Sequence, residues 1–298
     1  MAKGDPIIHR VDVFTRQAGQ GNPAAVVLNA QGLTDHQMQR IATEMNVSET
    51  AFVLPSDLPD ADLRIRWFTP ACEVSMCGHA TIATVYVLHQ SDLLPSQAAS
   101  RPIRIETKGG SLQATIETAG RGVSRTLVWL DLVAPKLTPV PFEPTVWSPL
   151  LGVPQDAFTF GPPPVRTQDR DLIVFVVDVI SLNEACPRMP ALAAHCREND
   201  IRGVCVSTVS TLSRSLTAQS RFFAPACGVD EDPVTGSVHG PLGVHLVNAG
   251  IVPTFNDMAA LTCTQASPVG RAGLVRILVQ RQPDGHCEVR IGGECVMT

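Results

Sequence analysis

The sequence lacks any apolar run long enough to cross a membrane. Its most apolar stretch, residues 172–180, is nine residues long and contains Asp178, whereas a transmembrane helix needs about 20 apolar residues. The first ten residues, MAKGDPIIHR, also lack the apolar centre of a secretory signal peptide. We therefore expect a cytoplasmic protein with no membrane partner.

Basic residues form no run and are not interleaved with aromatic residues. Lys and Arg total 23 against 28 Asp and Glu, so the formal net charge is −5. Binding to nucleic acid needs a cluster of basic residues, so we expect no nucleic-acid partner. Apolar residues make up 44% of the 298 residues, which is enough to bury a core in each of about two domains.

Patterns typical of metal, nucleotide and serine-hydrolase sites are weak or missing. The nine cysteines are interpreted as reduced thiols, because no export signal accompanies them. A structural zinc site carries two close cysteine pairs, and here the only close spacing joins Cys72 to Cys77. Cys227 and Asp232 could add ligands, but we expect no metal. The loose dinucleotide motif at residues 19–24, GQGNPA, precedes a predicted strand rather than a helix, and a G-x-S-x-G elbow is absent.

A short repeat organises the chain. Residues 66–74 read RWFTPACEV and residues 221–229 read RFFAPACGV, so six of nine positions are identical at an offset of 155 residues. This offset is close to half the chain length. The pattern predicts one supersecondary unit used twice, and therefore two similar lobes with equivalent loops. The alternative is that the copies are structural turns without a shared site.

Composition suggests where the two lobes divide. Residues 133–147, VAPKLTPVPFEPTVW, contain four prolines and no periodic pattern, so they are predicted to be a linker. The N-terminal lobe is then residues 1–132 and the C-terminal lobe residues 148–298. The last strand, residues 286–298, is assigned either to its own lobe or to the N-terminal one.

Periodicity predicts strands and helices in both lobes. Thr34 and Gln37 form a capping box that starts a helix ending near Asn46. A second, short helix is predicted at residues 191–198. Strands are predicted at residues 7–14, 24–28, 51–54, 103–106, 112–116, 126–132, 172–179, 204–209, 274–279 and 287–291.

Each repeat leads into a helix that is apolar on all sides, which indicates burial at the centre of its lobe. The first begins at residues 77–79 and the second at residues 235–237, and Gly250 is predicted to end the second. The N–H groups of a first helical turn lack partners within the helix and favour an anionic ligand. We therefore expect a small carboxylate substrate in a cleft between the lobes.

The repeat also suggests candidates for the chemistry at this cleft. The 155-residue offset places Cys77 opposite Asp232 and His79 opposite Val234. A thiol and a carboxylate on opposite sides of a cleft would make an acid/base pair. Cys77 lies at a helix start, which lowers the pKa of a thiol, although a small buried side chain is the alternative interpretation.

Two further candidates lie before strands of the first lobe. Glu49 is at the mouth of the predicted strand 51–54, where it is either a functional carboxylate or an ordinary solvated one. Asn22 belongs to a tight turn from which its amide can reach a ligand. Both residues are hypotheses that depend on the loops meeting at one site.

Together the motifs resemble those of a known family. The segments GNPAAVVL, MQRIATEMNVSETAFVL, RWFTPACEVSMCGHAT, RFFAPACGVDEDPVTGS and IGGECV are similar, in order and spacing, to the family of PhzF, the isomerase of phenazine biosynthesis. The resemblance covers nearly the whole chain. It implies an α/β (α+β) fold with two pseudosymmetric lobes, each a curled mixed β-sheet or barrel around a central α-helix, as in diaminopimelate epimerase and proline racemase.

The resemblance also implies site residues and an activity. In the PhzF family a glutamate moves a proton between carbon atoms without a cofactor, and its equivalent here is Glu49. His79 and Asp232 match the residues that assist it. The matching anchors for polar substrate groups are Gly78, Gly236 and Ser237. A homodimer acting on a carboxylate or amino-acid-like metabolite is therefore expected.

One departure from the related racemases leaves two alternatives open. Those enzymes use two thiols, one in each repeat, whereas the offset pairs Cys77 with Asp232. A two-thiol racemase is therefore not expected. An epimerase or racemase that uses Cys77 opposite a carboxylate remains an alternative, as does a non-catalytic protein that binds small ligands.

Overall fold

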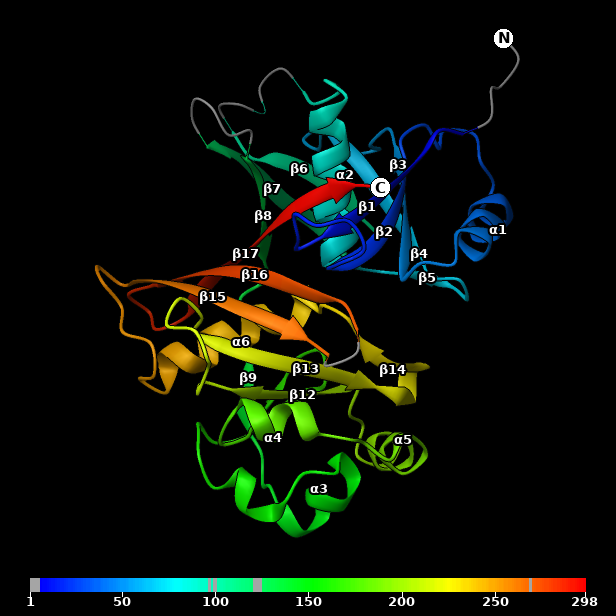
Figure 1. Cartoon of the computed structure of the whole chain (residues 1–298). Coiled ribbons are helices and arrows are strands. Elements are labelled where there is room, and N and C mark those ends of the chain that lie inside the picture. Colours follow the sequence, from blue (N-terminus) through cyan, green and yellow to red (C-terminus); the bar gives the residue numbers. More distant parts are fainter. Residues whose placement is uncertain (1–5, 96–97, 99–100, 120–124, 268–269) are drawn as a thin grey trace. The chain divides into compact units, whose positions relative to one another are not determined.

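The computed structural model describes residues 6–95, 98, 101–119, 125–267 and 270–298 (Figure 1). The chain forms two compact units. Unit 1 consists of residues 1–131 with 292–298, and unit 2 of residues 132–291. The last strand, β17 (Cys287–Met297), is divided between the two units. Residues 1–5 of the N-terminal stretch that was compared above with a signal peptide lie outside the described residues.

Unit 1 is a barrel closed around a helix. Its elements are β1 (Ile8–Val13), β2 (Asn22–Val27), α1 (Asp35–Met45), β3 (Glu49–Leu54), β4 (Leu63–Phe68), β5 (Glu73–Val74), α2 (Gly78–Gln90), β6 (Ile103–Thr107), β7 (Gly110–Ala119) and β8 (Arg125–Leu132). The pairing runs from β17 through β1, β2, β3, β4, β6, β7 and β8 and returns to β17, so eight strands close into a ring. β2 pairs with β3 and β4 with β6 in parallel, and β5 adds to β4.

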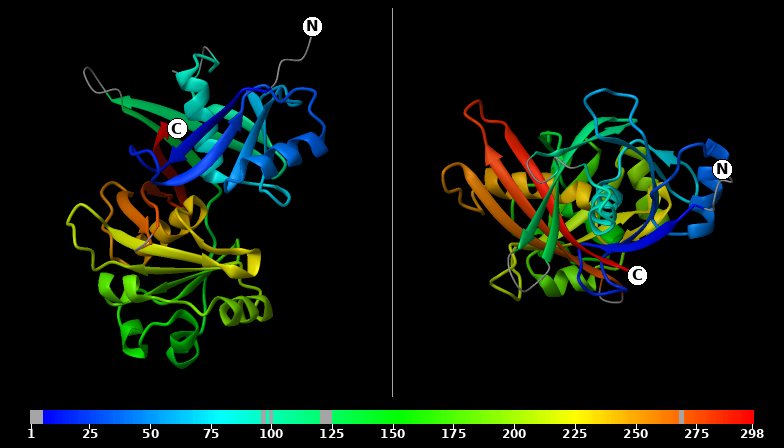
Figure 2. Two further views of the ribbon diagram at one scale, coloured as in Figure 1. Left: turned by 45° about the vertical axis from the view of Figure 1, so that its right-hand side comes forward. Right: turned by 90° about the horizontal axis from the view of Figure 1, so that it is seen from above.

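The helix α2 lies within this barrel because its side chains are apolar on every side. It contacts β1, β2 and β3, and the view from above in Figure 2 shows it end-on among the strands. Ile82, Val85 and Val87 have no exposed surface. The prediction of a buried helix after the first repeat is therefore confirmed.

The predicted helix from Thr34 to Asn46 is confirmed as α1. The Thr34 hydroxyl accepts the Gln37 N–H, and the Gln37 side chain accepts the Thr34 N–H. Asn46 ends the helix in the left-handed region, with φ 49°. Met38 and Ile41 pack against a core that includes residues of β2, β3 and β4.

Unit 2 repeats the arrangement of a sheet around a helix. Its elements are β9 (Leu137–Pro139), α3 (Pro144–Leu151), the 3₁₀ helix η1 (Gln155–Phe158), β10 (Val165–Thr167), β11 (Asp171–Phe175), α4 (Val179–Glu184), α5 (Met189–Glu198), β12 (Gly203–Thr208), β13 (Ala218–Ala224), η2 (Pro225–Cys227), β14 (Val229–Asp232), α6 (Gly236–Asn248), β15 (Met258–Ala266) and β16 (Ala272–Arg281). The pairing runs β9–β10–β11–β12–β13–β15–β16, and β14 also pairs with β13.

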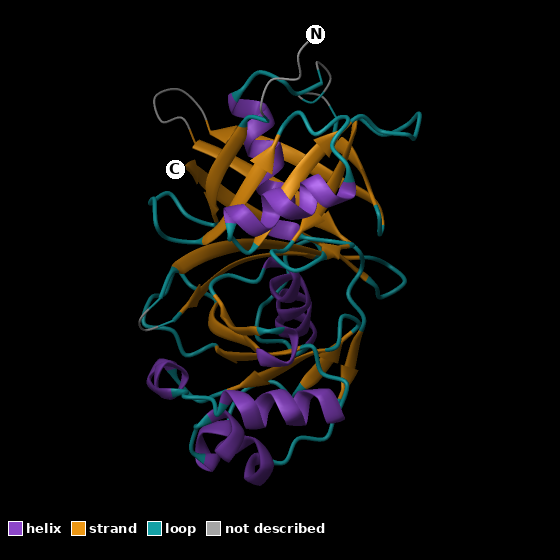
Figure 3. Ribbon diagram, turned by 90° about the vertical axis from the view of Figure 1, so that its right-hand side faces the viewer, coloured by secondary structure: helices purple, strands orange, loops and turns teal. Residues whose placement is uncertain are grey.

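The helices of unit 2 form two groups. The apolar helix α6 contacts β15 and β16, and Gly250, with φ +73°, follows its end as predicted. In Figure 3 strands enclose α6, whereas α3, α4 and α5 lie together outside the strands. The outer helices share a core with β11 and β12 that includes Leu151, Leu192 and Val206.

Residues 133–147 are more ordered than the linker that their composition predicted. They contain β9, in which Pro139 lies opposite Val165 of β10, and the start of α3. Pro144 is the first residue of α3, where its missing N–H costs no helical hydrogen bond. Pro139 and Pro144 therefore belong to a strand and a helix start of unit 2.

The apolar run at residues 172–179 is also divided differently from the prediction. It was expected to be one strand, but β11 ends at Phe175 and α4 begins at Val179. Asp178 causes the change, because its carboxylate accepts the Ser181 N–H at 2.8 Å and caps the helix. A β-branched run therefore contains a strand end and a helix start.

The repeat predicted from the sequence is a real structural module. Arg66 on β4 donates from Nε to Glu73 at 2.7 Å, and Arg221 on β13 donates from Nε to Glu231 at 2.8 Å. Each guanidinium also lies over the phenyl ring two residues later, at 5.2 and 4.9 Å. Both lobes therefore use the same arginine contact beside the strand end.

Beyond this arginine contact the copies leave the 155-residue register. Glu73 and Glu231 fill the same role but are 158 residues apart. Gly78 and Gly236, the first residues of α2 and α6, are separated by the same 158 residues. The second copy therefore holds three additional residues before its glutamate.

This shift corrects two predicted equivalences. Cys77 and Thr235 are the N-cap residues of α2 and α6, so Thr235 is the structural equivalent of Cys77. Cys77 and Asp232 are therefore not equivalent positions of the repeat, and neither are His79 and Val234. The cause is the three-residue insertion, which the sequence identities on its N-terminal side conceal.

Candidate functional site

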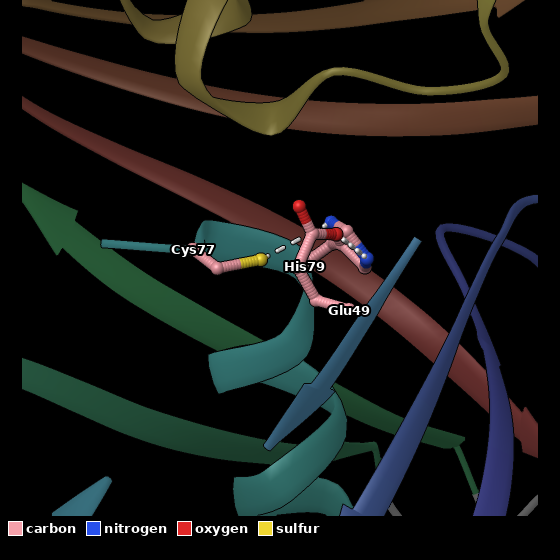
Figure 4. A group of neighbouring side chains, drawn as sticks. All are labelled: Glu49, Cys77 and His79. Carbon is pink, nitrogen blue, oxygen red and sulfur yellow. Dashed lines mark hydrogen bonds and ion pairs between the residues drawn. The ribbon is translucent and has the colours of Figure 1, made fainter. Parts of the chain in front are cut away.

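Three predicted residues of unit 1 form one cluster, which we call the acid/base cluster: Glu49, Cys77 and His79 (Figure 4). Glu49 Oε2 lies 3.2 Å from His79 Nε2. Cys77 Sγ lies 3.6 Å from His79 Nδ1. His79 therefore contacts a carboxylate with one ring nitrogen and a thiol with the other.

The local fold explains how these side chains meet. Glu49 is the first residue of β3, and α2 contacts β3 along the barrel interior. Cys77 is the N-cap of α2, with extended φ and ψ of −148° and 112°. The Thr81 hydroxyl donates to the Cys77 carbonyl at 2.6 Å, which fastens the start of the helix. The start of β3 and the start of α2 thus bring the three side chains of the acid/base cluster together.

The acid/base cluster is shielded from solvent. The Glu49 side chain is 21% exposed and that of His79 is 8% exposed. Burial raises the pKa of Glu49 to about 7, and a hydrogen bond from Cys77 works against this rise. A carboxyl group with a pKa near 7 is about half ionised at neutral pH, so Glu49 can both accept and donate a proton.

Asn22 has a supporting position beside the cluster. It is fully buried, and its side-chain oxygen accepts the Ser48 hydroxyl at 3.0 Å. Because Ser48 precedes Glu49, this bond fixes the chain as it enters β3. Contact between Asn22 and a ligand stays a prediction.

The turn before Asn22 requires a glycine. Gly21 has φ +67°, and a Cβ there would lie 2.0 Å from the Val13 carbonyl oxygen. The chain therefore passes directly over β1 before it starts β2. This close passage sets the position of Asn22.

The predicted residues of unit 2 surround the start of α6. Asp232 ends β14, and Gly236 and Ser237 are the first two residues of α6. The Thr235 hydroxyl donates to Asp232 Oδ2. Ser237 Oγ accepts from Arg202 Nη2 at 3.2 Å. Asp232 and Ser237 are thus held by polar partners of their own unit.

Comparison with known proteins places the chain in a family. The family model of the phenazine biosynthesis-like proteins, PhzC-PhzF, matches residues 11–298. The chain belongs to the PhzF family. Its sequence is 31% identical to the uncharacterized isomerase YddE of Escherichia coli K12, over 98% of this chain and 96% of YddE. It is 30% identical to an uncharacterized isomerase of Clostridium acetobutylicum, over 97% of this chain and 95% of the relative.

Solved structures agree with this PhzF-family assignment. The phenazine biosynthesis protein of the PhzF family from Bacillus anthracis has a TM-score of 0.88 at 28% identity and covers 98% of this chain and 96% of its own. A probable proline racemase from Agrobacterium radiobacter has a TM-score of 0.64 at 11% identity, covering 98% and 91%. The second likeness shows a shared fold alone. The predicted epimerase-like fold is therefore confirmed.

Among the described residues of this PhzF-family chain, the acid/base cluster is also the group that could hold a metal ion. One potential ligand atom from each of its three side chains lies within 4.8 Å of the other two. A tetrahedral zinc ion needs its ligand atoms around a common point. His79 instead directs Nδ1 at Cys77 and Nε2 at Glu49, so its two contacts use opposite sides of the ring. This arrangement favours contacts between the side chains of the cluster over a metal ion shared by all three.

Sequence reasoning missed the residues that hold Asp232 and Ser237 in unit 2. Thr235 and Gln265 bond to the segment carrying Asp232, and Arg202 bonds to Ser237. Gln265 offered a signal: it continues the series of buried positions of β15, after Ala259, Leu261 and Cys263, that alternates with less buried residues. A polar residue in such an apolar series needs a buried partner.

Proposed function

We propose that this PhzF-family protein is an isomerase that moves a proton between carbon atoms of a small carboxylate or amino-acid-like metabolite without a cofactor. The observation that carries the proposal is the buried Glu49 carboxyl, whose pKa is raised to about 7 and which lies 3.2 Å from His79. A group with this pKa can serve as base and then as acid at neutral pH.

The proposed reaction has two proton transfers. Ionised Glu49 removes a proton from a carbon next to an electron-withdrawing group, and the C–H electron pair is delocalised into that group. Protonated Glu49 then delivers the same proton to a second carbon, which restores the neutral carbon framework and the ionised Glu49. His79 holds the Glu49 carboxylate between the two steps through its Nε2 contact.

The proposed substrate class rests on the helix starts and on the fold relatives. Gly78 at α2 and Gly236 with Ser237 at α6 supply first-turn N–H groups, which favour a carboxylate. A hydroxyproline epimerase and a methylitaconate isomerase share the fold at TM-scores of 0.61 and 0.51. Asp232 is proposed to act on the same substrate as a polar contact.

The experiment is solvent exchange in D₂O followed by NMR. L-Proline, trans-4-hydroxy-L-proline, methylitaconate and the common amino acids are incubated with the protein, and deuterium on carbon is measured. We expect incorporation into at least one carboxylate, lost in Glu49→Gln and kept in Glu44→Gln, an exposed control on α1. If Glu49→Gln exchanges at the unaltered rate, the proposal fails.

A second candidate function is an epimerase in which Cys77 is the proton carrier. It is favoured by the contact of Cys77 Sγ with His79 Nδ1, since a histidine partner promotes the thiolate. In that case Cys77→Ser abolishes exchange while Glu49→Gln retains it. Binding of these carboxylates without any carbon exchange would instead support a non-catalytic binding protein.

We also propose that the protein is a homodimer and works in the cytoplasm, as its family resemblance suggests. Sedimentation equilibrium tests the first point. A mass near 31.9 kDa, that of a single chain, would contradict it.

A further inference from the structure

The polar group around Asp232 is built at a junction of three strands. One edge of β13 pairs with the end of β15, where Ser220 lies opposite Gln265. The same edge then pairs with β14, where Phe222 lies opposite Asp232. The ends of β14 and β15 therefore meet beside β13, with Asp232 on one and Gln265 on the other.

Gln265 binds both ends of the loop from Asp232 to Thr235. Its Nε2 donates to the Asp232 carbonyl oxygen at 2.6 Å and to Thr235 Oγ1 at 3.2 Å. Its Oε1 accepts the Thr235 N–H at 2.9 Å. Gln265 is 1% exposed, so this amide is satisfied by the loop it holds.

These contacts determine the direction of the Thr235 hydroxyl. The Gln265 amide nitrogen only donates, so the Thr235 oxygen accepts from it and must donate its own hydrogen elsewhere. That hydrogen goes to Asp232 Oδ2. If the Gln265 amide were turned over, its NH₂ group would face the Thr235 N–H, and its oxygen would face the Asp232 carbonyl oxygen. Neither pair can form a hydrogen bond, so the orientation of the amide is fixed.

The first repeat supplies an internal comparison. In unit 1 the position equivalent to Asp232 is Val74, which lies opposite Trp67 as Asp232 lies opposite Phe222. Thr107, at the end of β6, takes the place of Gln265 and donates to Gly110. The polar contacts occur in the copy that carries the carboxylate. Because a buried amide must be satisfied to be tolerated, a purely structural junction could use the version found in the first copy, which has no buried amide at this position.

We propose that Gln265 is a positioning residue, which fixes the Asp232 carboxylate through the Thr235 hydroxyl. This inference rests on the proposed function, in which Asp232 contacts the substrate. Asp232 is held as a hydrogen-bond acceptor, which suits a substrate group that donates, such as an amine or a hydroxyl. Gln265 itself acts only through Thr235 and the loop.

The test measures the Asp232 carboxylate directly, without a substrate. Full-length protein is labelled with ¹³C-aspartate, and the Asp232 signal is assigned with Asp232→Asn. The hydroxyl hydrogen bond produces an isotope shift of the carboxyl carbon between H₂O and D₂O. We expect this shift in the unaltered protein and in Thr235→Ser, and its loss in Thr235→Val and Gln265→Met. Gln280→Met, on neighbouring β16, is the matched control and should keep it.

Retention of the full isotope shift in Gln265→Met overturns the inference. If that variant does not fold, Gln265→Glu decides the point, because a carboxylate keeps the acceptor for the Thr235 N–H and removes both donors. In the D₂O exchange assay we expect both Gln265→Met and Thr235→Val to be about tenfold slower, as for the loss of one positioning hydrogen bond. Failure of the unaltered protein to exchange any compound rejects the proposed function, whereas the carbon signal still decides the role of Gln265.

Discussion

Glu49 Oε2 and His79 Nε2 lie 3.2 Å apart, although one residue opens a strand and the other belongs to the first turn of a buried helix. The two groups meet because α2 fills the barrel whose wall includes β3. The geometry of the acid/base cluster is thus set by the packing of a helix inside a sheet. A change in the depth of the helix would separate the pair.

Glu49 should make the stability of the protein depend on pH. Its pKa is raised from 4.5 to about 7 in the folded protein. Below pH 4.5 the group is protonated in both states, so burial carries no electrostatic penalty. Between pH 4.5 and 7 the unfolded chain releases the proton first, so the free energy of unfolding falls by up to about 3 kcal/mol and stays lower above pH 7.

Urea denaturation of Glu49→Gln at pH 4.5 and pH 8 checks this prediction. The variant should lose that pH-dependent component and gain stability relative to the unaltered protein as pH rises. Glu44→Gln, exposed on α1, is the control and should follow the unaltered protein. Equal pH dependence in Glu49→Gln would show that Glu49 is not perturbed.

Cys77 should lower the pKa of Glu49 through their hydrogen bond. Removing this bond in Cys77→Ala leaves burial unopposed, so the pKa of Glu49 is expected to rise further. Cys77→Ser keeps a donor and should change it less. The measurement is a ¹³C NMR titration of the Glu49 carboxyl carbon, with the exposed Cys72→Ala as control. A lower pKa in Cys77→Ala contradicts the prediction.

The two repeated arginines should differ in their contribution to stability. Arg221 is 7% exposed and binds Glu231, and it also donates to three backbone carbonyls of α4 and its C-cap. Arg66 is 16% exposed and pairs with Glu73 and the exposed Asp35. Arg221→Met should cost about 3–5 kcal/mol, because it leaves buried acceptors without a donor. Arg66→Met should cost about 1 kcal/mol.

Urea unfolding of both arginine variants gives the comparison. The variants serve as each other's control, since each removes the same contact from one copy of the repeat. A larger loss in Arg66→Met would mean that the additional carbonyl contacts of Arg221 contribute nothing.

The turn before Asn22 should tolerate alanine at one glycine and not at the other. Gly19 has φ +83° and nothing within 4 Å of an added Cβ, whereas an added Cβ at Gly21 meets the Val13 carbonyl at 2.0 Å. We expect Gly19→Ala to cost about 1–2 kcal/mol from backbone conformation alone. Gly21→Ala should cost about 3 kcal/mol or more, because steric overlap is added. Thermal unfolding of the two variants tests this order.

Local signals explain which parts of the fold could be predicted from the sequence. Thr34 and Gln37 form a cap within four residues, so α1 was predictable. The division between β11 and α4 was not predictable. It depends on Asp178, which lies inside an apolar run and caps α4 by accepting the Ser181 N–H, and the hydrophobic pattern does not show this contact. Short-range capping by a single side chain can override a β-branched composition.

The candidate site was predictable only in part, because some of its contacts join residues that are far apart in the sequence. The resemblance identified Glu49 and His79, which the structure brings to 3.2 Å. The equivalence of Cys77 with Asp232 failed because three inserted residues are invisible when identities continue as far as Val229. Gln265 was missed because its role depends on strands β14 and β15 meeting at β13, which no local pattern contains.

The division of β17 has a consequence for folding during synthesis. Residues 295–297 pair with β1 in the barrel of unit 1, yet they are synthesised only after all of unit 2. The barrel of unit 1 therefore lacks one strand while the about 160 residues of unit 2 are translated. Pairing between strands so far apart in the sequence is slow. The barrel that contains Glu49 and His79 therefore closes only after this last strand has been synthesised.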